Sequence, residues 1–153
     1  MSQKILSYDE SLKHFSLELV IVAINNQEKP KPFKFILDTG ATTTAINTEI
    51  TDYFQININT LPTVEVTSVD NIKNYPIVNM DGIIFGESGP EKLFRLDKVI
   101  VLYEVSKVKK YKSQMIEKKS YVNFPNIFGL DLLQMIKGKI TLDFKNNSFL
   151  LEW

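Results

Sequence analysis

The sequence contains no cysteine and a single histidine, His14. Without cysteine the chain can form neither disulfides nor thiolate metal sites, and one imidazole cannot build a zinc centre of several histidines. These absences exclude the commonest zinc-dependent chemistries from a single chain. We therefore expect a protein that works without a metal and without any other cofactor.

Net charge and long apolar runs are also absent. The 18 Lys and Arg residues balance the 18 Asp and Glu residues, so no overall field attracts nucleic acid or an anionic membrane. No stretch approaches the roughly 18 consecutive apolar residues that span a bilayer. We expect a soluble, cytoplasmic protein with no nucleic-acid or membrane partner. Its 153 residues, 44% of them hydrophobic, fit one domain over residues 1–153.

Strand periodicity is the clearest pattern that the sequence does contain. Between Phe15 and Ile24 apolar and polar side chains alternate, and a second alternating run from Phe33 to Leu37 follows the polar segment 25–32. A period of two is typical of a strand with one buried face. The two runs predict a hairpin whose turn is segment 25–32, with Asp38 directly after its second strand.

Two short helices are predicted beside these strands. Asn47 is suited to cap the first helix, which we expect to run to about Tyr53 because apolar residues recur there at helical spacing. The second helix is expected over Leu130–Lys137, with Gly138 as its C-terminal cap. The final strands flank Asn146–Asn147, since asparagine tolerates the positive φ of a tight turn.

The middle of the chain predicts further strands. Runs that begin at Val64 and Tyr75, joined by the polar segment 69–74, predict a projecting hairpin, although Asp81–Gly82 is a rival position for its turn. The run 93–103 is rich in β-branched residues and predicts another strand. The fold class is therefore mostly β.

A lysine-rich insert occupies residues 107–119. It favours a solvated loop or a short amphipathic helix, because the net charge is zero and Arg95 is the only arginine. The alternative is a patch for nucleic acid or an acidic partner, whose affinity would fall steeply with added salt.

The triplet Asp38-Thr39-Gly40 is the candidate for chemistry. Taken alone it is a weak signal, because all three residue types are ordinary in turns and Asp38 could simply cap one. Two features of its context make it more specific. An alternating strand precedes it, and a second apolar-apolar-glycine turn, Ile127 to Gly129, leads into the last predicted helix.

Together these stretches resemble the retropepsin-like aspartic proteases. The resemblance rests on LDTGAT from Leu37, on NIFGLDLL from Asn126, and on Asp143-Phe144 in a terminal strand. Viral members carry an arginine where this chain has Leu130, so the resemblance is to the cellular and bacterial branch. It implies a small closed β-barrel with a flap hairpin over the cleft, in which each subunit of a homodimer supplies one Asp-Thr-Gly turn.

By this resemblance Asp38 is the catalytic residue, and Thr39 interlocks with the opposite subunit. Gly40 permits a tight turn and offers its amide to the carboxylates. Ala41 follows, where pepsin-like relatives carry a hydroxyl. Two carboxylates about 3 Å apart hold one proton between them, so one acts as a base on water while the other acts as an acid.

The implied reaction is hydrolysis of an extended peptide or protein substrate. Substrate contacts are expected from Val69 and Asp70 in the flap and from Phe128 near the second turn. The flap tip 68–74 lacks the glycines of viral members. The alternative function is a catalytically silent peptide-binding or dimerisation module on the same fold.

Overall fold

The computed structural model describes residues 1–67, 69–110, 117–121 and 124–153, and for 105–110 and 117–121 it describes the backbone alone. The chain is mostly β, with two short α-helices, α1 (Thr48–Tyr53) and α2 (Leu130–Met135), and one 3-10 turn, η1 (Ile58–Thr60). The strands are β1 (Gln3–Ile5), β2 (Ser7–Asp9), β3 (His14–Ile24), β4 (Gln27–Leu37), β5 (Ala45–Ile46), β6 (Thr63–Thr67), β7 (Ile72–Ile84), β8 (Lys92–Val101), β9 (Val105–Lys110), β10 (Glu117–Tyr121), β11 (Asn126–Phe128), β12 (Lys139–Asp143) and β13 (Ser148–Glu152). Among the described residues, no helix is long and apolar enough to cross a membrane.

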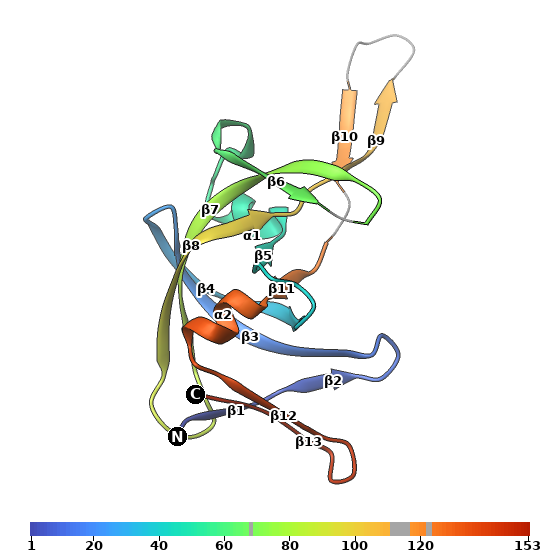
Figure 1. Cartoon of the computed structure of the whole chain (residues 1–153). Helices are drawn as coiled ribbons and strands as arrows, with labels where there is room; N and C mark the ends of the chain where they lie inside the picture. Colours follow the sequence, from blue (N-terminus) through green and yellow to red (C-terminus); the bar gives the residue numbers. More distant parts are fainter. Residues whose placement is uncertain (68, 111–116, 122–123) are drawn as a thin grey trace.

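The main sheet closes into a ring of strands. Its order is β2-β3-β4-β11-β5-β8-β7-β6, and β3 also pairs with β7, so that the neighbours from β3 through β4, β11, β5, β8 and β7 return to β3 (Figure 1). The pairs β4–β11 and β5–β8 are parallel. The pairs β3–β4, β3–β7 and β7–β8 are antiparallel. A ring of this kind hides most backbone edges, which open sheets leave exposed.

The alternating side chains of the long strands fill this ring. Leu17, Leu19 and Ile21 on β3 are at most 5% exposed, and they share the core with residues of α1 and α2. The predicted strand periodicity is therefore confirmed for β3. The first helix is also confirmed, because Asn47 caps α1 by accepting a hydrogen bond from the Ile50 amide.

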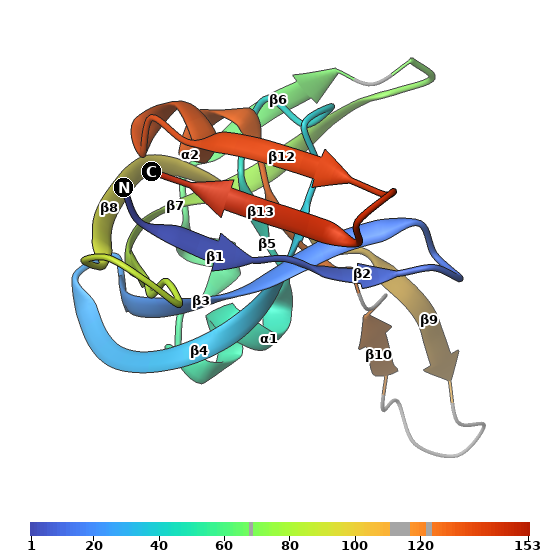
Figure 2. The same ribbon diagram turned by 90° about the horizontal axis from the view of Figure 1, so that it is seen from below.

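A smaller sheet joins the two ends of the chain. Its order is β1-β13-β12, so the N-terminal strand pairs with the last one (Figure 2). The backbones of Ser2 and Trp153 exchange two hydrogen bonds of 3.0 Å. The indole of Trp153 donates to the Pro90 carbonyl and packs against the core. Sequence reasoning missed β1 and β2, which are too short to show a period.

The β3–β4 hairpin is confirmed, but its turn is shorter than predicted. The turn consists of Asn25 and Asn26, with φ of 48° and 63°, and β4 begins at Gln27. Prolines 30 and 32 therefore lie inside β4 rather than in the turn. They are tolerated because β4 pairs with β11 only at residues 35–37, which leaves the proline segment at an edge of the sheet.

The projecting hairpin is formed by β6 and β7, with its turn after Thr67. The rival turn at Asp81–Gly82 is wrong, because both residues lie within β7. Glycine is needed there for packing: a Cβ on Gly82 would lie 2.3 Å from the ring of Phe94 on the neighbouring strand. Asp81 forms a 3.1 Å ion pair with Arg95 across the same pair of strands.

The lysine-rich insert contains strands where a loop or helix was predicted. Within its described backbone, β9 and β10 pair antiparallel, with Lys110 opposite Glu117. This two-stranded ribbon projects away from the ring in Figure 1. Antiparallel pairing satisfies the backbone hydrogen-bonding groups that face each other across the two segments, and the local composition did not reveal it.

Helix α2 is confirmed, but it ends in a way that the sequence did not predict. Lys137, with φ of 54°, occupies the left-handed position, and the amides of Lys137 and Gly138 donate to the carbonyls of Gln134 and Leu133. This is a Schellman motif in which the usual glycine is replaced by lysine. Gly138 instead lies one position beyond the left-handed residue, where a Cβ would lie 2.7 Å from Cδ1 of the partly buried Leu133 side chain.

Replacing Lys137 with glycine is therefore expected to stabilise the fold. A lysine in the left-handed conformation costs about 1 kcal/mol. Glycine removes this cost, but part of the gain is lost because glycine makes the unfolded chain more flexible. We expect a gain of about 0.5–1 kcal/mol in the free energy of unfolding, measured by urea denaturation. Gln134→Gly, at an exposed position within the same helix, is the control and should lose about 1 kcal/mol. A Lys137→Gly variant as unstable as this control would contradict the prediction.

Candidate active site

Asp38 begins the turn that leaves the end of β4. The last residues of β4 pair in parallel with β11, and this pairing is extended by a 3.1 Å hydrogen bond from the Asp38 amide to the Phe128 carbonyl. Near its end the strand is anchored by Phe33 and Phe35, which are 6% and 0% exposed, and its last residue, Leu37, is partly buried. The carboxylate therefore lies where a rigid, core-anchored strand reaches the surface.

The turn itself is held by its own backbone. The Ala41 amide donates to the Asp38 carbonyl at 3.1 Å, and the Gly40 amide donates to Asp38 Oδ1 at 2.9 Å. Asp38, Thr39 and Gly40 are all exposed, and Ala41 is partly buried. The predicted contact between the Gly40 amide and the carboxylate is present. The turn fixes the orientation of one carboxylate oxygen and leaves the group open to a reactant or to a second carboxylate.

A second turn supports the first from beneath. The Leu130 amide donates to the Ala41 carbonyl at 2.8 Å, and the Asp131 amide donates to the Thr42 carbonyl at 3.2 Å. The two segments are so close that a Cβ on Gly129 would lie 2.7 Å from the carbonyl carbon of Thr43. The two glycine turns, which the sequence analysis combined as one motif, are therefore in direct backbone contact.

Asp131 is the residue at this site that sequence reasoning underestimated. In the sequence, an acidic residue in the first turn of a helix indicates a favourable contact with the helix dipole and nothing further. In the structure its carboxylate accepts hydrogen bonds from the Thr44 amide at 2.9 Å and from the Thr44 hydroxyl at 2.6 Å. Thr44 is 0% exposed, and its Oγ1 in turn accepts from the Gly129 amide at 3.1 Å. No local signal marks this contact between residues 87 positions apart.

The three residues predicted to contact substrate lie in different surroundings. Val69 and Asp70 are exposed in the turn between β6 and β7, and Val69 has no contact that reduces its exposure. Phe128 is 0% exposed. Its side chain belongs to the core, and it reaches the site through the carbonyl that accepts from Asp38. The structure thus brings Phe128 and Asp38 together and leaves the flap residues in the separate β6–β7 hairpin.

Among the described residues, the site offers the Asp38 carboxylate and nearby backbone amides as its reactive and hydrogen-bonding groups. The described residues include no group of three or more His, Cys, Asp or Glu side chains placed to hold a metal ion. An exposed carboxylate on a braced turn can bind a water molecule or share a proton with a second carboxylate. It is suited to acid–base chemistry on water.

Comparisons with known proteins agree with this geometry. A family model described as aspartyl protease matches residues 20–105, which is more than half of the chain and includes the Asp38 turn. A similar solved structure is a retropepsin-like aspartic protease from Rickettsia conorii, with 18% sequence identity and a TM-score of 0.61, over 97% of this chain and 89% of that chain. At this identity the likeness shows the fold, which is retropepsin-like. No curated protein sequence matches the chain.

Proposed function

We propose that this chain, which belongs to the aspartyl protease family, is an endopeptidase whose active site is completed by a second copy of the chain. The observation that carries the proposal is the Asp38 turn. It presents one exposed carboxylate on a rigid double-turn support, whereas hydrolysis by this chemistry needs two carboxylates side by side. A twofold axis close to Asp38 would supply the second from an identical turn.

In the proposed mechanism the two Asp38 carboxylates share one proton. The ionised carboxylate removes a proton from a water molecule as that water attacks the peptide carbonyl. The protonated carboxyl donates its proton to the carbonyl oxygen as the tetrahedral intermediate forms. As the intermediate collapses, the C–N bond breaks. The carboxyl that took the proton from water then gives it to the leaving nitrogen, and the other carboxylate recovers its proton from the hydroxyl, which becomes the carbonyl of the new acid. The Gly40 amide holds Oδ1 of each carboxylate in place, so the pair does not need to reorganise during the reaction.

The proposed substrate is a peptide in extended conformation. It would lie between the β6–β7 hairpin and the Asp38 turn, bonded to the hairpin backbone as an added strand and recognised through alternate side chains. Val69 and Asp70, which are exposed at the hairpin turn, are the residues that we propose would cover such a peptide. Partly buried Ile127 and Leu130 flank the second turn and favour apolar residues beside the cleaved bond.

The test is cleavage of a mixed peptide library between about pH 4 and 7 at several protein concentrations. Because each site needs two chains, activity per chain should rise with concentration and reach a plateau once the dimer is saturated. Activity per chain that stays constant down to concentrations where sedimentation finds only monomer would contradict a shared site. If a folded dimer binds library peptides but cuts none, the chain is a silent peptide-binding module.

A further inference from the structure

We propose that a cavity beside the free edge of β4 is a second peptide-binding site, which holds an acidic segment of the substrate outside the Asp38 turn. The inference rests on the proposed function for its choice of a peptide as the ligand, and it adds a preference for carboxylate side chains. Binding at this cavity does not require cleavage, so the two proposals can be tested separately.

The cavity lies where β4 loses its second neighbour. Among the described residues, β11 pairs with β4 only at residues 35–37, so the earlier part of β4 pairs with β3 alone. Four consecutive residues of β4, from Lys31 to Lys34, line the cavity, as expected for a space along the edge of a strand rather than over one face. Its volume of about 530 Å³ lies within the range of about 300–1,000 Å³ that is usual for ligand pockets.

Two asparagines hold the shape of the cavity. Asn47 and Asn126, which line it, are 7% and 6% exposed. The side chain of Asn126 donates to the Lys34 carbonyl at 3.0 Å and accepts from the Asn47 amide at 2.8 Å. The side chain of Asn47 donates to the Phe124 carbonyl at 2.8 Å. These bonds join β4, the cap of α1 and the segment before β11, so the cavity is formed before any ligand binds.

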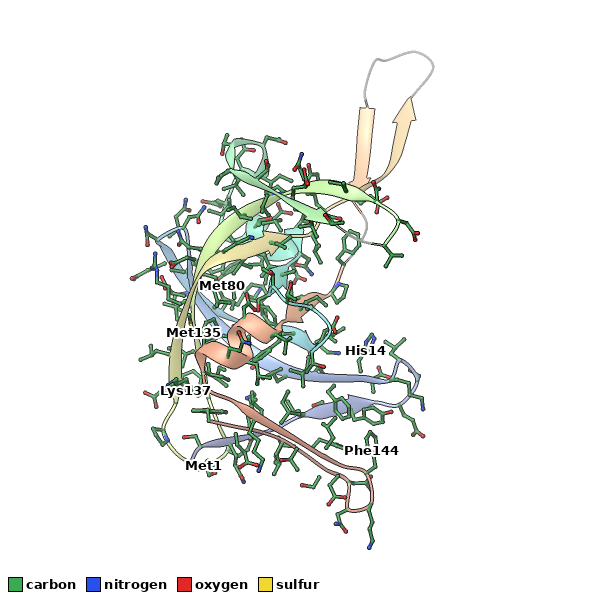
Figure 3. All side chains as sticks on the ribbon, viewed as in Figure 1. Met1, His14, Met80, Met135, Lys137 and Phe144 are labelled. Carbon is green, nitrogen blue, oxygen red and sulfur yellow. The ribbon has the colours of Figure 1, made fainter. Side chains whose placement is uncertain are left out.

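The lining has an excess of basic side chains. It contains His14, Lys31 and Lys34, against Glu49 as its single acidic residue. Neither lysine forms an ion pair with the described residues, although the Lys31 ammonium lies 4.7 Å from the centroid of the Tyr53 ring. His14 lies at the start of β3, beside the β2–β3 turn (Figure 3), and its Nδ1 is buried without a hydrogen-bond partner among the described residues. These features favour a ligand that carries negative charge and accepts hydrogen bonds.

The zero net charge of the chain conceals a separation of charge. Segment 29–34, on β4, and the insert 107–119 together contain nine of the 18 basic residues but only one of the 18 acidic residues. The first segment contributes to the lining of the cavity, and the second precedes Phe124, which also lines it. The rest of the chain has nine basic and 17 acidic residues. An anionic ligand is therefore attracted to this region and repelled by the remainder of the surface.

The chemistry of the edge indicates a peptide that is recognised through its side chains. Pro30 and Pro32 have no backbone N–H, so this part of β4 cannot form the regular ladder of an added strand. The rings of Phe33 and Phe124 line the cavity and suit the methylene groups of glutamate, while the lysines suit its carboxylate. Nucleic acid fits less well, because Glu49 would face a continuous row of phosphates, whereas a peptide can place its acidic residues beside the lysines alone.

The cavity shares both of its strands with the Asp38 turn. Ile36, which lines the cavity, is two residues before Asp38. Asn126 is two residues before Phe128, whose carbonyl accepts from the Asp38 amide. Lys34 is three residues before the end of β4, about 10 Å along an extended strand. Since an extended peptide covers that distance with three or four residues, the acidic segment should lie about three to six residues from the cleaved bond.

The first test measures the binding of two fluorescein-labelled peptides, one with four consecutive glutamates and one with four glutamines in their place. Fluorescence anisotropy with the Asp38→Asn variant separates binding from cleavage. The glutamate peptide should bind about tenfold more tightly than the glutamine peptide at about 0.1 M salt. In the same background, Lys31→Glu with Lys34→Glu should abolish this difference and leave the glutamine peptide within about twofold. Lys98→Glu with Lys137→Glu changes the net charge equally at exposed positions outside the cavity and should cost less than about threefold.

The second test removes the acidic residue of the lining and expects a gain. Glu49→Gln should bind the glutamate peptide about two- to threefold more tightly, because a repulsive carboxylate is lost. A damaged fold cannot produce such a gain. Asp52→Asn removes an exposed carboxylate from the same helix, outside the cavity, and should leave the affinity unchanged. Equal affinities in Glu49→Gln and Asp52→Asn would contradict a carboxylate site at the cavity.

Cleavage gives an independent measurement if the wild type is active. For a substrate with glutamates three to six residues from the cleaved bond, Lys31→Glu with Lys34→Glu should raise KM about tenfold and leave kcat unchanged, because the cavity binds substrate without touching the reacting atoms. The glutamine version of the substrate should show the same KM with both enzymes.

The outcomes separate this inference from the proposed function. If the wild type cuts peptides but the glutamate and glutamine peptides bind equally, the acidic-peptide site is overturned and the protease remains. If the glutamate peptide binds through Lys31 and Lys34 but the wild type cuts nothing, the site is established and the proposed function fails. If a single-stranded DNA of 20 thymidines binds more tightly than the glutamate peptide and depends on the same two lysines, the cavity is a nucleic-acid site and the inference is overturned.

Discussion

Asp38→Asn chains are expected to cut peptides about 10⁴-fold more slowly than the wild type, or not at all. Asparagine keeps the size of the side chain and an acceptor for the Gly40 amide, so the turn can form. Asparagine can neither take a proton from water nor donate one to the substrate, as the two members of a carboxyl pair must. The loss should appear in kcat, and the unfolding transition and the dimer affinity should stay close to those of the wild type.

Mixing the variant with wild-type chains tests whether the site is shared. A mixed dimer has only one Asp38 carboxyl and should be inactive. In a ninefold excess of Asp38→Asn chains, only about one in ten wild-type chains pairs with another wild-type chain, so the activity per wild-type chain should fall to about one tenth, provided that all chains are dimeric. Asp52→Asn, at an exposed position on α1, is the control and should leave activity unchanged. Undiminished activity in the Asp38→Asn mixture would mean that each chain works alone, and retained cleavage by the pure variant would remove Asp38 from the chemistry.

Sequence patterns predicted those parts of the fold whose signal is local. The alternation in β3, the asparagine cap of α1 and the position of the Asp38 turn all depend on residues within a few positions of one another. The same patterns identified the fold class, because several stretches agreed in their order along the chain. The retropepsin-like fold was predicted in this way, and the comparisons confirm it.

The errors share a physical cause, which is that distant partners overrode the local signal. The pair Asp81–Gly82 reads as a turn, but the ring of Phe94 on the next strand requires glycine inside β7. Prolines 30 and 32 indicate a turn, yet they lie inside β4, in a segment that β11 does not pair with. Strand β1 is visible only through its partner β13, at the other end of the chain.

At the candidate site, local sequence signals identified the candidate catalytic turn at Asp38 but not the distant residues that hold this turn in place. The motif marks Asp38, Thr39 and Gly40, since chemistry and turn geometry restrict all three residue types. It does not mark Thr44 or Asp131, because their contact forms only once the two turns are packed together. The contact between Thr44 and Asp131, which are 87 positions apart, therefore has to be found in the structure.

Asp131→Ala is expected to lower the free energy of unfolding by about 3 kcal/mol or more. The alanine removes the acceptor for both the amide and the hydroxyl of Thr44, and Thr44 is 0% exposed, so both donors lose a partner inside the protein. Each buried donor without a partner costs about 1–3 kcal/mol. Since the same contact holds the β4–β5 connection against α2, cleavage should also fall by about tenfold or more at temperatures where the variant is still folded.

Asp131→Asn separates the hydrogen bonds of this residue from its charge. One carbonyl oxygen in the position of Oδ1 can still accept from both Thr44 donors, which lie 2.9 and 2.6 Å away. The NH2 group in the position of Oδ2 cannot accept the second contact of the Thr44 amide, which is 3.0 Å long in the wild type. This variant should therefore lose only about 1 kcal/mol and keep most of its activity. Equal losses for alanine and asparagine would show that the negative charge of Asp131 is what matters. Wild-type stability in the alanine variant would mean that the two turns stay together through their backbone contacts alone, and that Gly129 and the Leu130 amide are sufficient to hold Asp38 in place.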